Sequence, residues 1–291
     1  MNQQQRKQRL LVALALISLY FIWGSTFLAI RYAIDSFPPF MMAAMRFLTA
    51  GVLLYAVLRL RGAPNPSLPQ WGGAAVVGML LPAVGNGGVS YAEQWVTTGA
   101  AALAIATVPL WAALFSGLWG DWPNRREWLG IALGLLGVLA LNLGGNMRAS
   151  PVGAAVLLLA AAGWAFGSLW SRRLPMPGGA MASAAQMLVG GAVLAGASLL
   201  SGEHMIGKPT QQAWLAMAYL VTFGSWIAYS AYLYLLRTVR PILATSYAFV
   251  NPLVALLLGV WLMGEHIGGF EWLALLAILG GVVLVLTAKE S

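Results

Sequence analysis

The chain has 291 residues, of which 60% are hydrophobic and only 8% carry a charge. A soluble domain usually has about 25% charged residues because its surface faces water, and disorder requires low hydrophobicity and high charge. The complete lack of cysteine excludes disulfides, thiolate metal sites and cysteine nucleophiles. The composition therefore indicates an integral membrane protein.

Apolar stretches of about 20 residues, the length that crosses a bilayer as a helix, recur along the whole chain. Ten spans are expected, at 10–31, 39–60, 70–93, 97–120, 126–145, 150–172, 179–200, 211–237, 240–263 and 267–288. The first stretch is too long for a cleavable signal and is expected to be retained. The predicted fold is all-α, in contact with the lipid bilayer, with consecutive helices antiparallel because the loops are short.

Basic residues favour the cytoplasmic side of a membrane. With ten spans and a cytoplasmic N-terminus, most of the 16 lysines and arginines fall on that side. The net charge of +8 is therefore interpreted as a topology signal rather than a nucleic-acid-binding surface. Both termini are expected to be cytoplasmic.

The two halves of the chain resemble each other when one is shifted by about 140–144 positions. Matched residues include Leu48 with Leu188, Gly51 with Gly191, Pro109 with Pro252, and Glu127-Trp128-Leu129 with Glu271-Trp272-Leu273. Each copy has five spans, so the second must enter the membrane from the opposite side. The expected domains are 1–147 and 148–291, an inverted repeat typical of transporters. Duplication of a membrane scaffold is the alternative.

Motifs spread over the whole chain carry a family resemblance. They are Trp23-Gly24-Ser25, Arg46, Pro109, Ala244-Thr245-Ser246, Asn251-Pro252, Gly264-Glu265 and Gly280-Gly281-Val282. Together they resemble the EamA-type branch of the drug/metabolite transporter superfamily, and within it the aromatic amino acid exporters. The resemblance implies ten helices in two inverted halves and export of amino acids or related metabolites across a bacterial inner membrane. Asp121 departs from the family pattern, which usually has Glu there.

Helix-breaking residues interrupt three spans. In span 70–93 they are Pro82, Gly85, Gly87 and Gly88, with Asn86 among them. Irregular backbone at membrane depth survives only where it is buried in protein or lines a watery cavity. Pro109 and Pro252 predict further breaks at matching places, and paired interruptions point to a transport site. Kinks that serve packing alone would explain the prolines equally well.

Arg46 lies inside the second span, where a charge is costly and needs a partner. Glu93, at the end of the third span, is the expected partner. The pair would either shape a gate or hold two helices together.

The other polar groups expected within spans are uncharged. The candidates for the cavity are Asn86, Trp164, Ser168, Gln186, Ser225, Tyr229, Ser246, Tyr247 and Asn251. Most single hydroxyls could instead bond to their own helix. Together the set predicts a neutral cavity with aromatic surface, which suits a zwitterion with an apolar side chain. A phosphate would need a basic cluster.

No carboxylate is expected at mid-span, so export driven by the substrate gradient is expected, with at most weak proton coupling through Glu93. No enzyme activity, metal or cofactor is expected, because His204 and His266 lie in loops and offer too few ligands. The expected small-molecule substrate is an amino acid, and a monomer would suffice. Efflux of other metabolites or drug-like cations, and a scaffold or sensor role, are the alternatives.

Overall fold

The computed structural model describes residues 3–96, 98–142, 150–205, 207–263 and 269–288. All regular secondary structure in these ranges is helical, so the all-α prediction is confirmed for them. The expectations for Gly264, Glu265 and His266 lie outside the described residues.

The first part of the chain forms helices that follow the expected spans. They are α1 (Gln3–Ile34), α2 (Pro39–Leu60), α3 (Leu68–Gly78), the π-helix η1 (Met79–Gly87), α4 (Gly88–Ala92), α5 (Thr98–Ile105), α6 (Val108–Gly117) and α7 (Arg125–Asn142). Proline at the first turn starts α2 and α6, where its missing N–H has no helical partner to lose. Gly62, with φ of +83°, follows the end of α2 in a conformation that only glycine adopts readily.

The second part repeats this pattern. Its helices are α8 (Pro151–Trp170), α9 (Ala180–Leu200), α10 (Gln211–Tyr219), the π-helix η2 (Leu220–Tyr229), α11 (Ser230–Thr238), α12 (Pro241–Thr245), α13 (Tyr247–Met263) and α14 (Gly269–Thr287). Side-chain caps begin two of them: the Ser150 hydroxyl accepts the Gly153 N–H at 3.0 Å, and the Thr210 hydroxyl accepts the Ala213 N–H at 3.2 Å.

Several of the described helices have the length and surface of membrane spans. Five described helical runs are long and apolar enough to cross a bilayer: Gln3–Ile34, Pro39–Leu60, Leu68–Ala92, Pro151–Trp170 and Ala180–Leu200. Shorter apolar runs cover Ala101–Gly117, Pro241–Val254 and Trp272–Thr287. Large apolar side chains such as Leu14, Phe21 and Leu159 point outward, and an apolar outer surface of this kind faces lipid.

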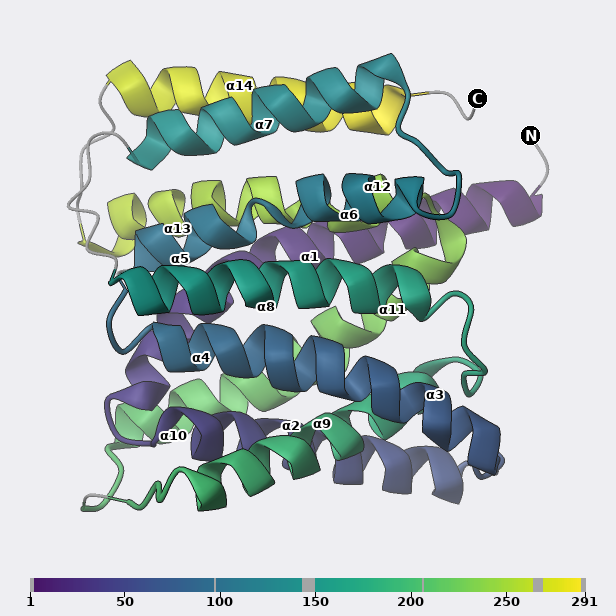
Figure 1. Ribbon diagram of the computed structural model, residues 1–291, viewed down its shortest axis with the longest axis vertical. Coiled ribbons are helices and arrows are strands. Elements are labelled where there is room, and N and C mark those ends of the chain that lie inside the picture. Colours follow the sequence, from purple (N-terminus) through teal and green to yellow (C-terminus); the bar gives the residue numbers. More distant parts are fainter. Residues whose placement is uncertain (1–2, 97, 143–149, 206, 264–268, 289–291) are drawn as a thin grey trace.

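The helices run back and forth along one direction. Helix α1 begins and helix α14 finishes at the same end of the bundle, here called the termini end (Figure 1). The opposite end, where α1 finishes and α2 begins, is called the far end. The first helices of the two halves run in opposite directions, because α1 starts at the termini end and α8 starts at the far end (Figure 1).

Contacts between the halves are reciprocal. Helices α2 and α9 pack together, and so do α7 and α14. Gly51 on α2 lies against Leu188, while Gly191 on α9 lies against Leu48. The residues that match in the sequence repeat therefore exchange places across this contact, as they do around a twofold axis.

The same reciprocity holds for α7 and α14. A Cβ on Gly130 would lie 2.8 Å from the Gly281 carbonyl oxygen, and one on Gly281 would lie 2.7 Å from that of Gly130. A Cβ on Gly281 would also lie 2.8 Å from the Gly134 backbone nitrogen, so glycines on both helices let the two backbones approach closely.

Candidate functional site

A pocket lies in the interior of the bundle, with about 500 Å³ of empty space, solvent at its mouth included. Side chains from both halves line it: Trp23, Thr26, Phe27, Ile30, Gly85, Asn86, Val89, Ile105, Val108, Ala160, Trp164, Tyr247 and Asn251. Among the described residues no charged side chain lines the pocket. The lining residues with polar groups are Thr26 and Tyr247 with a hydroxyl, Asn86 and Asn251 with an amide, and Trp23 and Trp164 with an indole N–H.

Four aromatic rings pack together, and three of them line the pocket. We call them the aromatic cluster: Trp23, Trp164, Tyr232 and Tyr247. The Trp23 ring lies 4.7 Å from Tyr247 and 5.5 Å from Trp164, both edge to face. Tyr232 completes the set at 5.4 Å from Trp164 and 5.6 Å from Tyr247. Such contacts fix ring orientation beyond the burial of area alone.

Hydrogen bonds hold the two indoles of the cluster. Trp164 Nε1 donates to the Tyr232 hydroxyl at 3.0 Å, and that hydroxyl also bonds Ser168 Oγ at 2.7 Å. Trp23 Nε1 donates to the Gly224 carbonyl at 3.1 Å. The aromatic surface of the pocket is therefore built before any ligand arrives, which lowers the cost of binding.

Asn251 supplies the clearest sign of a missing ligand. Its side chain lines the pocket and is 3% exposed, and Oδ1 has no hydrogen-bond partner. A buried acceptor without a partner costs free energy, so the site favours a bound group that donates a hydrogen bond to this oxygen.

Both long interrupted helices contain a π-helical segment. The expected irregular run around Asn86 is η1, with Pro82 inside it, and η2 occupies the corresponding place in the second half. Segment η1 packs against α8 and α9, whereas η2 packs against α1 and α2. Segments of this kind often mark functional sites because they leave backbone groups outside the regular ladder.

The predicted helix breaks fare differently. Gly85 and Gly87 lie in η1 and Gly88 begins α4; a Cβ on Gly85 would meet Trp164 Cε3 at 2.5 Å, so glycine lets this wall approach. Pro109 follows the gap between α5 and α6, as expected. The break expected at Pro252 is wrong, because α13 continues through it. In this half the interruption lies at Ser246, between α12 and α13.

The nine predicted cavity residues divide into two groups. Asn86, Trp164, Tyr247 and Asn251 line the pocket. The others do not line it and serve buried contacts instead: Ser168 with Tyr232, Gln186 with Tyr229 at 2.5 Å, Ser225 with Arg46 at 2.9 Å, and Ser246 with Tyr20 at 2.9 Å.

The expected ion pair between Arg46 and Glu93 is wrong. Arg46 is 3% exposed, points to η2 and donates from Nε to Ser225 Oγ, while its guanidinium covers Gly224. Glu93 is 1% exposed, and neither carboxylate oxygen has a hydrogen-bond partner. The two residues come from different helices, and their rotation about those helices is set by packing that the sequence does not display.

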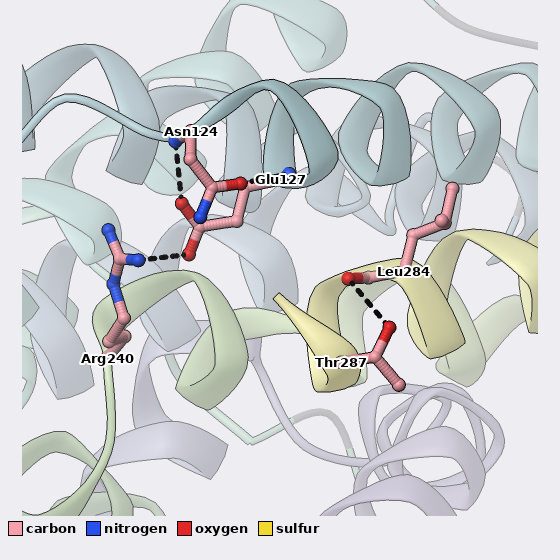
Figure 2. Close-up of polar contacts among 5 residues, drawn as sticks. All are labelled: Asn124, Glu127, Arg240, Leu284 and Thr287. Atoms are coloured by element: carbon pink, nitrogen blue, oxygen red, sulfur yellow. Dashed lines mark hydrogen bonds and ion pairs between the residues drawn. The ribbon is translucent and has the colours of Figure 1, made fainter. Parts of the chain in front are cut away.

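Polar links join the two halves at both ends of the bundle. At the termini end, Arg240 pairs with Glu127 at 3.0 Å, and Glu127 in turn accepts the Asn124 N–H at 2.8 Å (Figure 2). At the far end, the Glu203 carboxylate accepts the backbone N–H groups of Phe40 and Met41 at 3.0 and 2.7 Å. A carboxylate is favourable at the start of α2 because the helix dipole is positive there.

The sequence alone does not identify several of the pocket residues, notably Trp23, Thr26 and Phe27 on α1. In the sequence Trp23 stands out only as part of the Trp23-Gly24-Ser25 motif. Trp164 occupies the matching place in the second half and was a cavity candidate, so the repeat would have indicated that Trp23 also lines the cavity. The others are ordinary apolar or hydroxyl residues, which nothing in the sequence separates from residues that face lipid.

Comparison with known proteins places this arrangement in a family. The model of the EamA-like transporter family matches twice, over residues 10–143 and 151–287. The chain is 51% identical to the uncharacterized inner membrane transporter YedA of Escherichia coli (strain K12), over 94% of this chain and 90% of YedA. It is 30% identical to the uncharacterized transporter YdfC of Bacillus subtilis (strain 168), over 91% and 85% of the two chains. A solved crystal structure shares the fold with a TM-score of 0.77 at 21% identity, over 94% of this chain and 96% of the other.

Proposed function

Because the chain belongs to the EamA-like transporter family and resembles an inner membrane transporter over nearly its whole length, we propose that it exports aromatic and other neutral amino acids. The pocket would be exposed alternately to the two sides of a bacterial inner membrane. The protein is a transporter rather than an enzyme, as its relatives are named.

The architecture proposed for this activity is ten crossings in two inverted halves, 1–147 and 148–291. The opposite directions of α1 and α8 support it (Figure 1), as do the reciprocal contacts of Gly51 and Gly191. The termini end is assigned to the cytoplasm because most basic residues follow the positive-inside rule in this orientation. The far end then faces the periplasm.

The observation that carries the substrate proposal is the chemistry of the pocket wall. Trp23, Trp164 and Tyr247 offer aromatic surface to an apolar or aromatic side chain. The unpartnered Asn251 Oδ1 accepts a hydrogen bond from an amino group. The lack of a lining charge among the described residues disfavours phosphates and strongly cationic drugs, which need an opposite charge.

Alternating access then follows from the two polar links. A pocket that opens toward the cytoplasm requires the Glu127–Arg240 pair to separate, and one that opens toward the periplasm requires Glu203 to leave the start of α2. The halves have equivalent folds, so each can adopt the conformation of the other. The π-helical segments η1 and η2 lie between the halves and are the places where such a change is absorbed.

The test is counterflow in sealed vesicles that contain the purified protein. Vesicles loaded with unlabelled phenylalanine should accumulate radiolabelled phenylalanine, recovered chemically unchanged, and tryptophan and leucine should compete. Glucose 6-phosphate should not compete. Accumulation no faster than in protein-free vesicles for every amino acid tested would overturn the proposed substrate class.

A further inference from the structure

Glu93 is a buried acid that the proposed transport cycle has not yet used. It follows the last residue of the helical run Leu68–Ala92, at the far end of the bundle, and is 1% exposed. Neither carboxylate oxygen has a hydrogen-bond partner. Burying a charge without a partner is far more costly than burying the neutral acid, so the geometry itself favours a carboxyl that holds a proton.

Among the described residues, few charged groups lie near Glu93. Helix α4 packs against α8 and η1, which contain no charged residue, and against α2. On α2, Arg46 is bonded to Ser225. On α1, Arg31 donates to the Glu93 backbone carbonyl at 3.3 Å, and its guanidinium lies 3.7 Å from Asp35.

The side chain is placed to act on the pocket. Val89 and Asn86 line the pocket from the same stretch of helix, and residues four and seven positions apart share one helix face. Glu93 therefore stands one turn beyond Val89, between the pocket and the periplasmic end of the bundle. On α1, Phe27 lines the pocket and Arg31 lies four positions further along the same helix face.

We propose that the Glu93 carboxyl is a proton-binding site, and that exchange of its proton couples export of the substrate to the proton gradient. The far end closes over Glu93 as the neutral acid, as it does in this structure. When the far end opens to release substrate, the carboxyl meets water and exchanges its proton with the periplasm. The return of the empty carrier with the far end closed then requires the protonated form. When the cytoplasmic end opens, water in the pocket accepts this proton and delivers it to the cytoplasm. The loaded carrier then moves outward with Glu93 ionised, so one proton enters for each substrate exported.

The expected pH dependence follows from the burial of this side chain. The neutral acid is the form that can be buried without a partner. The closed state is therefore retained at low pH and is lost as the pH rises far enough to ionise the carboxyl.

The proton site is tested without any substrate. Infrared difference spectra of the parent protein should show the C=O stretch of a protonated carboxyl, which disappears as the pH is raised and the buried carboxyl ionises. The band should be missing in E93Q and retained in D35N. D35N is the matched control because Asp35 is also an acid beside Arg31, but its side chain is exposed. An identical titrating band in E93Q would overturn the proposal. If E93Q does not fold, E93D replaces it. A shifted midpoint for the pH titration of the carboxyl band in E93D supports the assignment to Glu93. A midpoint equal to that of the parent protein overturns the assignment.

The coupling step rests on the proposed function and is tested separately. An imposed pH gradient, acidic on the periplasmic side, should accelerate phenylalanine export by the parent and by D35N. E93Q should lose this acceleration while it retains phenylalanine counterflow. Acceleration that persists in E93Q would overturn the coupling. A parent protein with the titrating band but no phenylalanine counterflow supports the proton site and overturns the proposed substrate instead.

Discussion

Gly85 sits where the backbone of η1 meets the pocket-lining Trp164, and G85A tests that wall directly. The added Cβ would lie 2.5 Å from Trp164 Cε3, whereas carbon atoms pack best at about 3.5–4.0 Å. The indole must therefore move by about 1 Å, against its hydrogen bond to Tyr232 and its edge contact with Trp23. Overpacking of this kind costs about 1–3 kcal/mol.

That cost acts on the surface that the substrate contacts, so it should reduce affinity by about 5- to 150-fold. The assay is the concentration dependence of phenylalanine counterflow, at equal amounts of folded protein measured by size-exclusion chromatography. G196A on α9 is the matched control, because a Cβ there meets nothing within 4 Å. A G85A variant that folds and keeps the half-saturating concentration of the parent would refute the placement of Trp164 in the site.

Two further predictions concern hydrogen bonds and the links between the halves. Y232F should lower the free energy of unfolding in detergent by about 1–3 kcal/mol because Trp164 Nε1 loses its acceptor. Y20F should cost less, because Ser246 keeps its bond to the Leu243 carbonyl, and equal losses in the two variants would contradict this reasoning. E127Q should raise exposure of the pocket to the cytoplasmic side, and E203Q should raise exposure to the periplasmic side, both measured by a membrane-impermeant thiol reagent on a pocket cysteine. The same direction of change in both variants would show that these links do not control opposite ends.

The sequence was sufficient for the features that composition and helix breakers determine. The second span was expected at 39–60 and α2 is Pro39–Leu60. Pro82 and the glycines after it indicated the irregular segment that became η1, together with Asn86 in the pocket wall. Backbone constraints of this kind act locally, so they can be predicted without knowledge of the tertiary structure.

The orientation of polar side chains could not be predicted in the same way. Ser225 and Ser168 lie in apolar spans whose faces differ little, so only packing decides that they bond Arg46 and Tyr232 rather than a substrate. The η2 segment has no proline and was missed, although a shift by the repeat offset places the η1 run on it. Glu93 was expected to pair with Arg46, and only the tertiary structure shows that it is buried without a partner.

The central claim, a pocket exposed in turn to both sides of the membrane, is tested most directly by cysteine labelling. The chain has no native cysteine, so A160C introduces a single thiol into the pocket wall, and A113C, buried outside the pocket, is the control. The account predicts that a membrane-impermeant reagent labels A160C from either side in sealed vesicles of opposite orientation, that phenylalanine slows both reactions, and that A113C stays unlabelled. Labelling of A160C from one side only, with and without phenylalanine, would contradict the account.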